Sequence, residues 1–207
     1  MVISTGPLTG TGAPSAARFN ISALSPQTGI LASSNCGGSF GFHLKRAGYD
    51  ALILKGKCSG HKWLEINDDQ FTFHDAYNLW GMKTGQCQEA LVQLVGKKEF
   101  GKLCIGPAGE NLVKYAGIFS DERASGRTGL GSVLGWKNLK AITVTGTKNV
   151  PHPRQGKDHR MVQKVVCLPT EPSPHRQAVT QGWDRRPGQF HAGLRFAFYQ
   201  ELLCRTV

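Results

Sequence analysis

Residues 1–150 predict a fold of short β-strands and short α-helices in which one unit occurs twice. Two observations carry this prediction. Short apolar runs rich in β-branched residues are bounded by glycine or by turn residues, which is typical of strands. A pattern of glycine, leucine and alanine also recurs along the chain at a constant offset of about ninety residues.

The strand and helix patterns can be placed along these residues. Strands are predicted where β-branched runs occur, namely at Ala51–Lys55, Lys62–Ile66, Gln70–His74 and Ala141–Thr145, and Met1–Thr5 resembles the end of another. Asp68 and Asp69 indicate a hairpin turn between the second and third runs. Helices are predicted at Gly38–Ala47, Lys83–Val95 and Ser132–Trp136. The spacing in Lys83–Val95 predicts a core-facing stripe made of Cys87, Ala90, Leu91, Leu94 and Val95.

The repeated pattern pairs two helix-and-strand segments. Gly41-x-x-Leu44 followed by Ala51–Gly56 matches Gly131-x-x-Leu134 followed by Ala141–Gly146, and a Gly-Pro pair precedes each copy. Chance similarity between glycine-rich segments is the alternative. If the repeat is real, it predicts two related half-sites that face each other across a pseudo-twofold axis.

Four segments concentrate glycine, small polar residues and arginine: Gly6–Asn20, Ser25–Gly41, Gly106–Leu112 and Asp121–Gly135. We interpret them as loops. Glycine lets backbone N–H groups approach an anion, and arginine offers a two-pronged donor for phosphate. Asn35 could cap the helix that follows or give a carbonyl oxygen to magnesium. Arg18 and Arg127 could instead be solvated, or be paired with Glu110 or Asp121.

Several classes of protein are excluded. No apolar run is long enough for a membrane helix, and the first residues lack the features of a signal peptide, so a cytoplasmic protein is expected. The net charge of +11 is spread along the chain without a basic helix, which argues against nucleic acid as a partner. The six cysteines form no C-x-x-C pair, which indicates reduced and mostly buried thiols. Thr128–Gly131 is not a dinucleotide loop, because no strand is predicted ahead of it.

Residues 151–207 differ from residues 1–150. They hold six of the ten prolines and four of the seven histidines, and no helical or strand period persists in them. One interpretation is a proline-rich linker with a short helix near Phe196–Leu203. The other, which we favour, is an irregular tail translated out of frame, because natural segments usually give locally consistent signals.

Several blocks of residues 1–150 together resemble one family. The blocks are GPLTGTGAPSAARFN, SPQTG, SNCGGSFGFHLKRAGYDALILKGK, LWG, IGPAGENLVKYAGI, ASGRTGLGSVLGWKNLKAI and VTGTK. In this order they resemble the N-terminal domain of the aldehyde ferredoxin oxidoreductase family. The resemblance implies an α+β domain with two mixed β-sheets and an internal duplication, on which a tungsten bis-pterin cofactor lies.

The resemblance also implies residue roles. It assigns cofactor contacts to seven positions: Arg18, Asn35, Gly37, Arg123, Ala124, Gly126 and Arg127. The backbone carbonyls of Asn35 and Ala124 would bind the magnesium ion that bridges the pterin phosphates. Two departures from the family pattern fall here: the segment before Arg123 is one residue shorter than usual, and Thr128 stands where glycine is common.

The whole enzyme implied by the resemblance is larger than this chain. Family members oxidise an aldehyde to a carboxylate and pass electrons through a 4Fe-4S cluster to ferredoxin, and the full-length form could be a homodimer. The cluster cysteines and the acid–base residues belong to domains that are absent from these 207 residues. We therefore expect the chain to bind cofactor without turnover on its own. The alternative is a non-catalytic remnant of such an enzyme.

Overall fold

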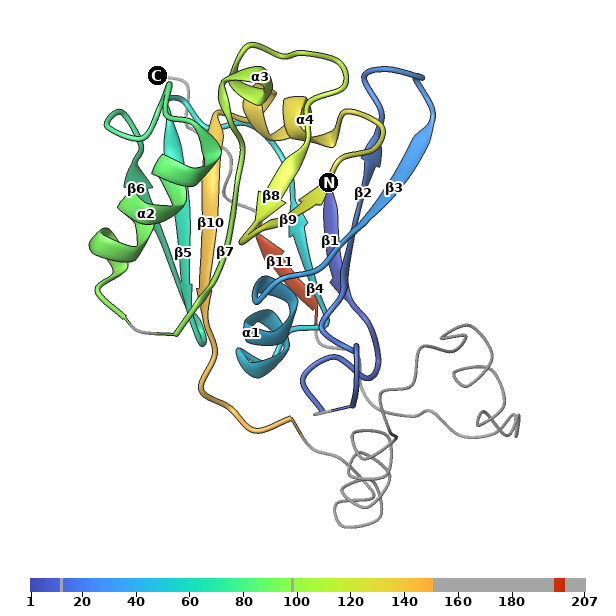
Figure 1. The fold of residues 1–207 in the computed structure, drawn as a ribbon, viewed down its shortest axis with the longest axis vertical. Helices are drawn as coiled ribbons and strands as arrows, with labels where there is room; N and C mark the ends of the chain where they lie inside the picture. The colour runs from blue at the N-terminus through green and yellow to red at the C-terminus, as the bar shows by residue number, and fades with distance from the viewer. Residues whose placement is uncertain (12, 98, 151–195, 200–207) are drawn as a thin grey trace, which may run out of the picture. The chain divides into compact units, whose positions relative to one another are not determined.

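The computed structural model describes residues 1–11, 13–97, 99–150 and, for the backbone alone, 196–199. Its strands form two mixed sheets (Figure 1). The first sheet has the order β11-β4-β1-β2-β3, with β1 Val2–Thr5, β2 Phe19–Leu24, β3 Leu31–Cys36, β4 Ala51–Leu54 and β11 Phe196–Tyr199. The second has the order β6-β5-β10-β7-β8-β9, with β5 Lys62–Asn67, β6 Gln70–Asp75, β7 Gly101–Cys104, β8 Ile118–Ser120, β9 Arg123–Ser125 and β10 Leu139–Thr145.

The two sheets contain the same four-stranded unit. In the first sheet β4-β1-β2-β3 are neighbours and every pairing among them is antiparallel. In the second sheet β10-β7-β8-β9 have the same order and the same antiparallel pairings. In the first unit the seven-residue helix α1, Phe40–Arg46, precedes β4. In the second unit the seven-residue helix α4, Leu130–Trp136, precedes β10. The predicted α+β class and internal duplication are therefore confirmed.

Equivalent glycines let the two helices approach the chain closely. A Cβ atom on Gly41 would lie 3.2 Å from the carbonyl oxygen of Ala17, just ahead of β2. A Cβ atom on Gly131 would lie 2.4 Å from the carbonyl oxygen of Gly117, just ahead of β8. A real Cβ atom does not come that close to a backbone oxygen, so Gly131 is required by packing.

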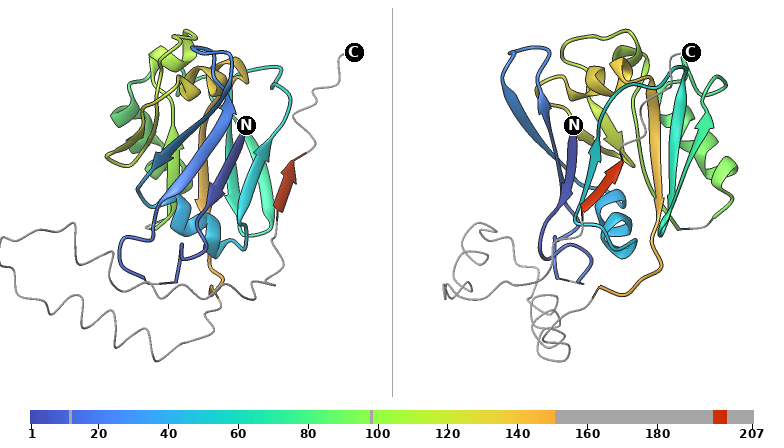
Figure 2. Two further views of the ribbon diagram at one scale, coloured as in Figure 1. Left: turned by 90° about the vertical axis from the view of Figure 1, so that its right-hand side faces the viewer. Right: turned by 180° about the vertical axis from the view of Figure 1, so that it is seen from behind.

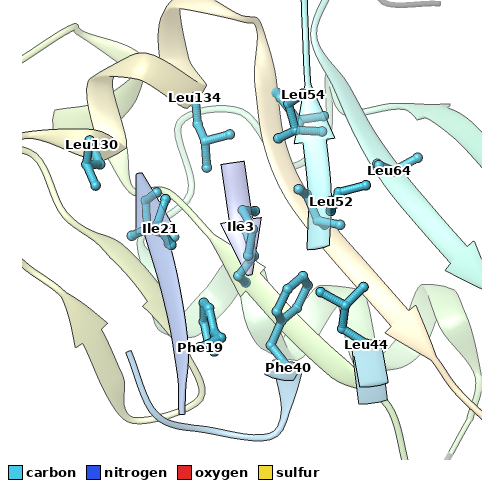
Figure 3. Close-up of a cluster of buried hydrophobic side chains, with 14 of the residues drawn as sticks. Ile3, Phe19, Ile21, Phe40, Leu44, Leu52, Leu54, Leu64, Leu130 and Leu134 are labelled. Carbon is cyan, nitrogen blue, oxygen red and sulfur yellow. The ribbon is translucent and has the colours of Figure 1, made fainter. Parts of the chain in front are cut away.

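The main core lies between the sheets (Figure 3). Ile3 and Ile21 of the first sheet and Leu64 of the second belong to one buried cluster, to which α1 contributes Phe40 and Leu44. The rings of Phe19 and Phe40 lie 5.1 Å apart. Burial of this apolar surface is the dominant favourable contribution to the free energy of folding.

A second, smaller core lies on the other face of the second sheet. There α2, Thr84–Val95, packs Cys87 and Leu91 against Cys104 and Ala141. Because β10 lies between two layers, six of its seven residues are buried. The short α3, Pro107–Glu110, follows β7 and packs on α4. The views in Figure 2 show the two sheets and α2 from other directions.

The structure corrects several predictions about secondary structure. Ser25–Gly41 is not all loop, since it contains β3, and Asp121–Gly135 contains β9 and the start of α4. Likewise Gly6–Asn20 runs into β2, and Gly106–Leu112 contains α3. The strand β3 was missed because L-A-S-S-N-C has few residues that favour strands. Its pairing with β2 makes it a strand.

Two further predictions about helices and strands are wrong. Leu94 is 59% exposed, so it does not belong to the buried stripe of α2. A strand, β9, does precede Thr128, but it pairs antiparallel with β8 and is not a neighbour of β10. A dinucleotide-binding unit needs parallel strands on either side of its helix, so Thr128–Gly131 does not form one.

The predicted tail can be compared with the structure at four residues only. Phe196–Tyr199 form β11, which pairs parallel with β4, so a helix at these residues is wrong. The rest of the predicted tail, including 151–195 and 200–207, lies outside the described residues. Within the described part of the chain, no helix combines the length and the apolar character that crossing a membrane requires.

The two leucines of α2 test the position of the smaller core. Leu91→Ala should lower the free energy of unfolding by about 2–5 kcal/mol, because Leu91 is fully buried. Leu94→Ala should change it by less than about 0.5 kcal/mol. Chemical denaturation of both variants measures the difference, and equal losses would contradict this packing of α2.

Candidate functional site

The candidate site lies where the edges of the two sheets meet. β3 is the last strand of the first sheet and β9 is the last strand of the second, and the two strands are in contact. They occupy equivalent places in the duplicated unit. An edge strand leaves one row of backbone N–H and C=O groups unpaired by its own sheet. The unpaired backbone rows of β3 and β9, one from each half of the repeat, therefore lie next to each other.

One face of the first sheet is polar beside this edge. Residues directly opposite in paired strands share a face. The register places Ser4 opposite Asn20 and Asn20 opposite Asn35, while Ser22 lies opposite Ser33. The alternating residues Ile3 and Ile21 point into the core. The exposed face is also tied together by a hydrogen bond of 2.7 Å from Ser33 Oγ to Asn20 Oδ1.

The residues assigned from the resemblance are all accessible. Six of the seven are exposed and Gly37 is half-buried. Asn35 is the exposed residue near the end of β3, and Gly37 follows β3 directly. A Cβ atom on Gly37 would lie 3.4 Å from Cγ of Arg123, so the residue that follows β3 lies against the side chain that begins β9. Arg123 and Ala124 begin β9.

The remaining assigned residues extend this group. Arg18 precedes β2, and its charge acts on the thiol of Cys36, the neighbour of Asn35. Burial raises the pKa of Cys36, while amide groups at Ser120 and Gly37 and the charge of Arg18 oppose that rise. Gly126 follows β9, and a Cβ atom there would find no atom within 4 Å. Arg127 comes next and is exposed.

The arginines do not pair with the acids suggested from the sequence. Glu110 pairs with the fully buried Lys140 of β10, and Asp121 pairs with Lys102 of β7 at 2.8 Å. Among the residues the structure describes, no ion pair involves Arg18, Arg123 or Arg127. Three cationic side chains therefore face solvent around the meeting of β3 and β9, which favours an anionic ligand.

Asn35 does not cap the helix that follows it. The cap residue of α1 is Ser39, and Asn35 lies inside β3. The alternative role, a backbone carbonyl offered to a cation, is compatible with an edge strand. No cluster of three or more histidine, cysteine, aspartate or glutamate side chains capable of holding a metal occurs in the described ranges. The predicted buried thiols are confirmed for Cys36, Cys58, Cys87 and Cys104, while Cys167 and Cys204 lie outside the described residues.

The shortened segment before Arg123 forms a tight hairpin. Ser120 pairs with Arg123, so only Asp121 and Glu122 connect β8 to β9. The carboxylate of Asp121 accepts hydrogen bonds from the backbone N–H and the hydroxyl of Ser39, both at 2.7 Å. No local pattern predicts this contact, because the two residues are 82 positions apart.

Thr128, the second departure from the family pattern, is strained. Its φ angle is 65°, a left-handed conformation that β-branched residues avoid. Ser25 Oγ donates a hydrogen bond of 2.8 Å to the Thr128 carbonyl oxygen and holds the turn in place. The strain lies immediately after Arg127, one of the positions assigned from the resemblance.

Removal of this strain should be measurable. Left-handed backbone costs a non-glycine residue about 1–2 kcal/mol, and glycine loses about 0.5–1 kcal/mol of chain entropy on folding. Thr128→Gly should therefore raise the free energy of unfolding by up to about 1 kcal/mol. Thr128→Ala retains the backbone penalty and is the control. A less stable glycine variant in thermal unfolding would contradict the strain.

The ionisation of Asp121 predicts a pH dependence of stability. Burial raises its pKa, but hydrogen bonds from Lys102 and Ser39 outweigh burial, so the net pKa is lowered. A carboxyl group with a lowered pKa stabilises the folded state at pH values above its unfolded pKa of about 4. This stabilisation is lost as the pH falls through the pKa of the folded state. The stability gap between the chain and Asp121→Asn should thus be constant above about pH 5 and shrink below about pH 4. Urea denaturation across this pH range measures it, and a gap that widens in acid would contradict the shift.

The chain is similar to several known proteins. The family described as "Aldehyde ferredoxin oxidoreductase, N-terminal domain" matches residues 1–146. The tungsten-containing aldehyde ferredoxin oxidoreductase of Pyrococcus furiosus is 46% identical over 80% of this chain, and that of Thermococcus kodakarensis is 45% identical over 73%. These matches cover only 28% and 25% of the relatives' own lengths. The chain thus spans about a quarter of these curated relatives.

A solved structure is also similar. The active-site complex BamBC of benzoyl coenzyme A reductase, in complex with 1,5-dienoyl-CoA, matches with a TM-score of 0.76 and 34% sequence identity. The match covers 80% of this chain and 25% of that one.

Proposed function

The chain belongs to the aldehyde ferredoxin oxidoreductase family through its N-terminal domain, and from this premise we propose that it cradles a tungsten bis-pterin cofactor. The cofactor would serve an oxidoreductase that converts aldehydes to carboxylates, with ferredoxin as electron acceptor. Tungsten, aldehyde and ferredoxin are named in the relatives' own descriptions.

The observation that carries the proposal is the meeting of two equivalent edge strands. A ligand built from two like halves matches a site built from two like halves. β3 brings Asn35 with Gly37 behind it, and β9 brings Arg123 and Ala124. A single anion bound by one loop would not need the second copy of the unit.

The residues present fit such a ligand. Arg18, Arg123 and Arg127 are exposed cations, suited to phosphate oxygens. The space beside Gly126 is open, and only the Arg123 side chain approaches Gly37. Both features leave the backbone accessible to a ligand. We propose that the backbone carbonyls of Asn35 and Ala124 would bind a magnesium ion, since carbonyl oxygens are ligands that magnesium accepts.

This domain's contribution to the reaction is binding and orientation. When bound, the tungsten cofactor supplies the redox chemistry of aldehyde oxidation. The arginines would hold the phosphates, the edge strands would set the orientation, and the polar row of Asn20, Ser22 and Ser33 would provide hydrogen-bonding groups beside the site. Rigid strands position a ligand better than free loops do.

The other parts of the reaction would lie in sequence corresponding to the remaining length of the relatives. We propose that the 4Fe-4S cluster, the acid–base groups and the ferredoxin contact belong there, in a cytoplasmic enzyme whose full-length form could be a homodimer. The 207-residue chain should then bind cofactor without turnover. Aldehyde-dependent reduction of viologen by the purified chain would contradict that division of roles.

Cofactor retention tests the proposal. The chain should be produced in a host that makes the tungsten cofactor, with tungsten measured by mass spectrometry and pterin by fluorescence after oxidative release. The unaltered chain should retain both. Arg123→Met and Arg127→Met should each lower retention about tenfold or more, since a charged hydrogen bond is worth about 1.5–3 kcal/mol. Lys83→Met, an exposed cation at the start of α2, is the matched control and should change nothing.

If the unaltered chain retains neither tungsten nor pterin, the proposed function is contradicted. If the Lys83 control loses as much cofactor as the arginine variants, retention depends on overall charge and not on this site.

A further inference from the structure

A single carboxylate links the two half-sites. Asp121 lies in the hairpin that leads into β9, two residues before Arg123, and its φ angle is 51°. One of its oxygens, Oδ2, accepts hydrogen bonds from both the backbone N–H and the hydroxyl of Ser39. Ser39 ends the short Gly37–Ser39 loop that follows β3 and is the cap residue of α1. The bond therefore joins the loop after β3 to the hairpin before β9.

Asp121 is itself anchored on two other elements. Its second oxygen, Oδ1, pairs with Lys102 of β7 at 2.8 Å. Its backbone carbonyl oxygen accepts a hydrogen bond of 3.0 Å from Gln88 Nε2 of α2. Both carboxylate oxygens of Asp121 therefore have partners, and its backbone carbonyl is bonded to α2. The hairpin consequently has little freedom to move.

Packing reinforces the hydrogen bonds. Gly38 has a φ angle of 98°, and a Cβ atom there would lie 2.7 Å from Ser120 Oγ and 2.9 Å from Asp121 Oδ2. The loop after β3 therefore lies directly against the hairpin with no room for a side chain. A shift of either segment would break this contact.

We propose that Asp121 is a positioning residue that holds the two half-sites in one arrangement. This inference rests on the proposed function for its purpose, but the linkage concerns residues of this chain alone. Asp121 is not among the residues assigned to the cofactor. It acts through Ser39 on Asn35 and Gly37, and through the hairpin on Arg123 and Ala124.

The chain offers a matched control in Asp68. It also lies in a two-residue hairpin, between β5 and β6, and its φ angle is 48°. Its carboxylate accepts hydrogen bonds from the backbone N–H and the hydroxyl of Thr147, at 2.9 and 2.7 Å. Asp121 accepts the same two kinds of hydrogen bond, from Ser39, and in addition pairs with Lys102. The place differs, because β6 and β9 are the opposite edges of the second sheet.

The experiment compares Asp121→Ala, Asp121→Asn and Asp68→Ala in the 207-residue chain. Hydrogen–deuterium exchange without cofactor reports on residues 33–39 and 122–127. Tungsten and pterin retention is measured on the same variants. Asp121→Ala should raise exchange about tenfold in both segments together and lower retention about tenfold or more, as loss of a supporting residue does at metal sites.

The controls separate positioning from general stability. Asp68→Ala should lower the unfolding temperature, by less than Asp121→Ala because Asp121 also loses its ion pair with Lys102. It should raise exchange only around its own turn and leave retention unchanged. Asp121→Asn keeps an oxygen that accepts from Ser39 and should retain cofactor to within about threefold of the unaltered chain. Should Asp121→Ala fail to fold, Ser39→Ala removes one of the two bonds and should give the same exchange pattern at smaller amplitude.

Unchanged exchange at residues 33–39 in Asp121→Ala, or in Ser39→Ala if the former does not fold, would overturn the inference. So would an equal loss of cofactor in Asp68→Ala. If the unaltered chain retains no cofactor, the proposed function fails, while the exchange data still decide whether Asp121 couples the two segments.

Discussion

The site depends on the contact between β3 and β9, which brings together the free edges of two different sheets. Exposed strand edges are normally a liability, because their unpaired backbone groups can pair with another chain. Here three exposed arginines, Arg18, Arg123 and Arg127, surround the two edges. The unpaired N–H and C=O groups become useful when a ligand has to be bound from two directions. The core between the sheets serves to hold these edges at a fixed separation.

Duplication explains how one chain builds two matching edges. Each half supplies three consecutive antiparallel strands, a helix and a returning fourth strand, and the halves also exchange strands. After β4 the chain forms β5, which joins β10 of the other half in parallel; after β10 it leads eventually to β11, which joins β4 in parallel. The two sheets are therefore connected by these exchanged strands as well as by the shared core. The alignment with the Pyrococcus furiosus relative covers 80% of this chain. Residues 1–150 are a smaller share of the 207 residues, so the alignment also includes part of residues 151–207.

Strong local patterns allowed part of the fold to be predicted. β5, β6, β10 and α2 were found within a residue or two, because β-branched runs and helical spacing are local signals. β3 and β9 were missed, because S-S-N and R-A-S become strands only through pairing with β2 and β8. The seven site residues came from family resemblance, and their roles stay predictions, although the fold brings Gly37 and Arg123 together. Asp121 could not be found from sequence, since its partner Ser39 is distant along the chain.

Anomalous diffraction at a tungsten absorption edge tests the central claim most directly. Crystals of the chain isolated with bound tungsten should show one strong peak beside the facing edges of β3 and β9, near Asn35 and Arg123. That position would place the ligand between the two copies of the repeat. A peak elsewhere, for example against α2 or on the far edge at β6, would contradict the account, because the duplicated edges would then have no part in holding the metal.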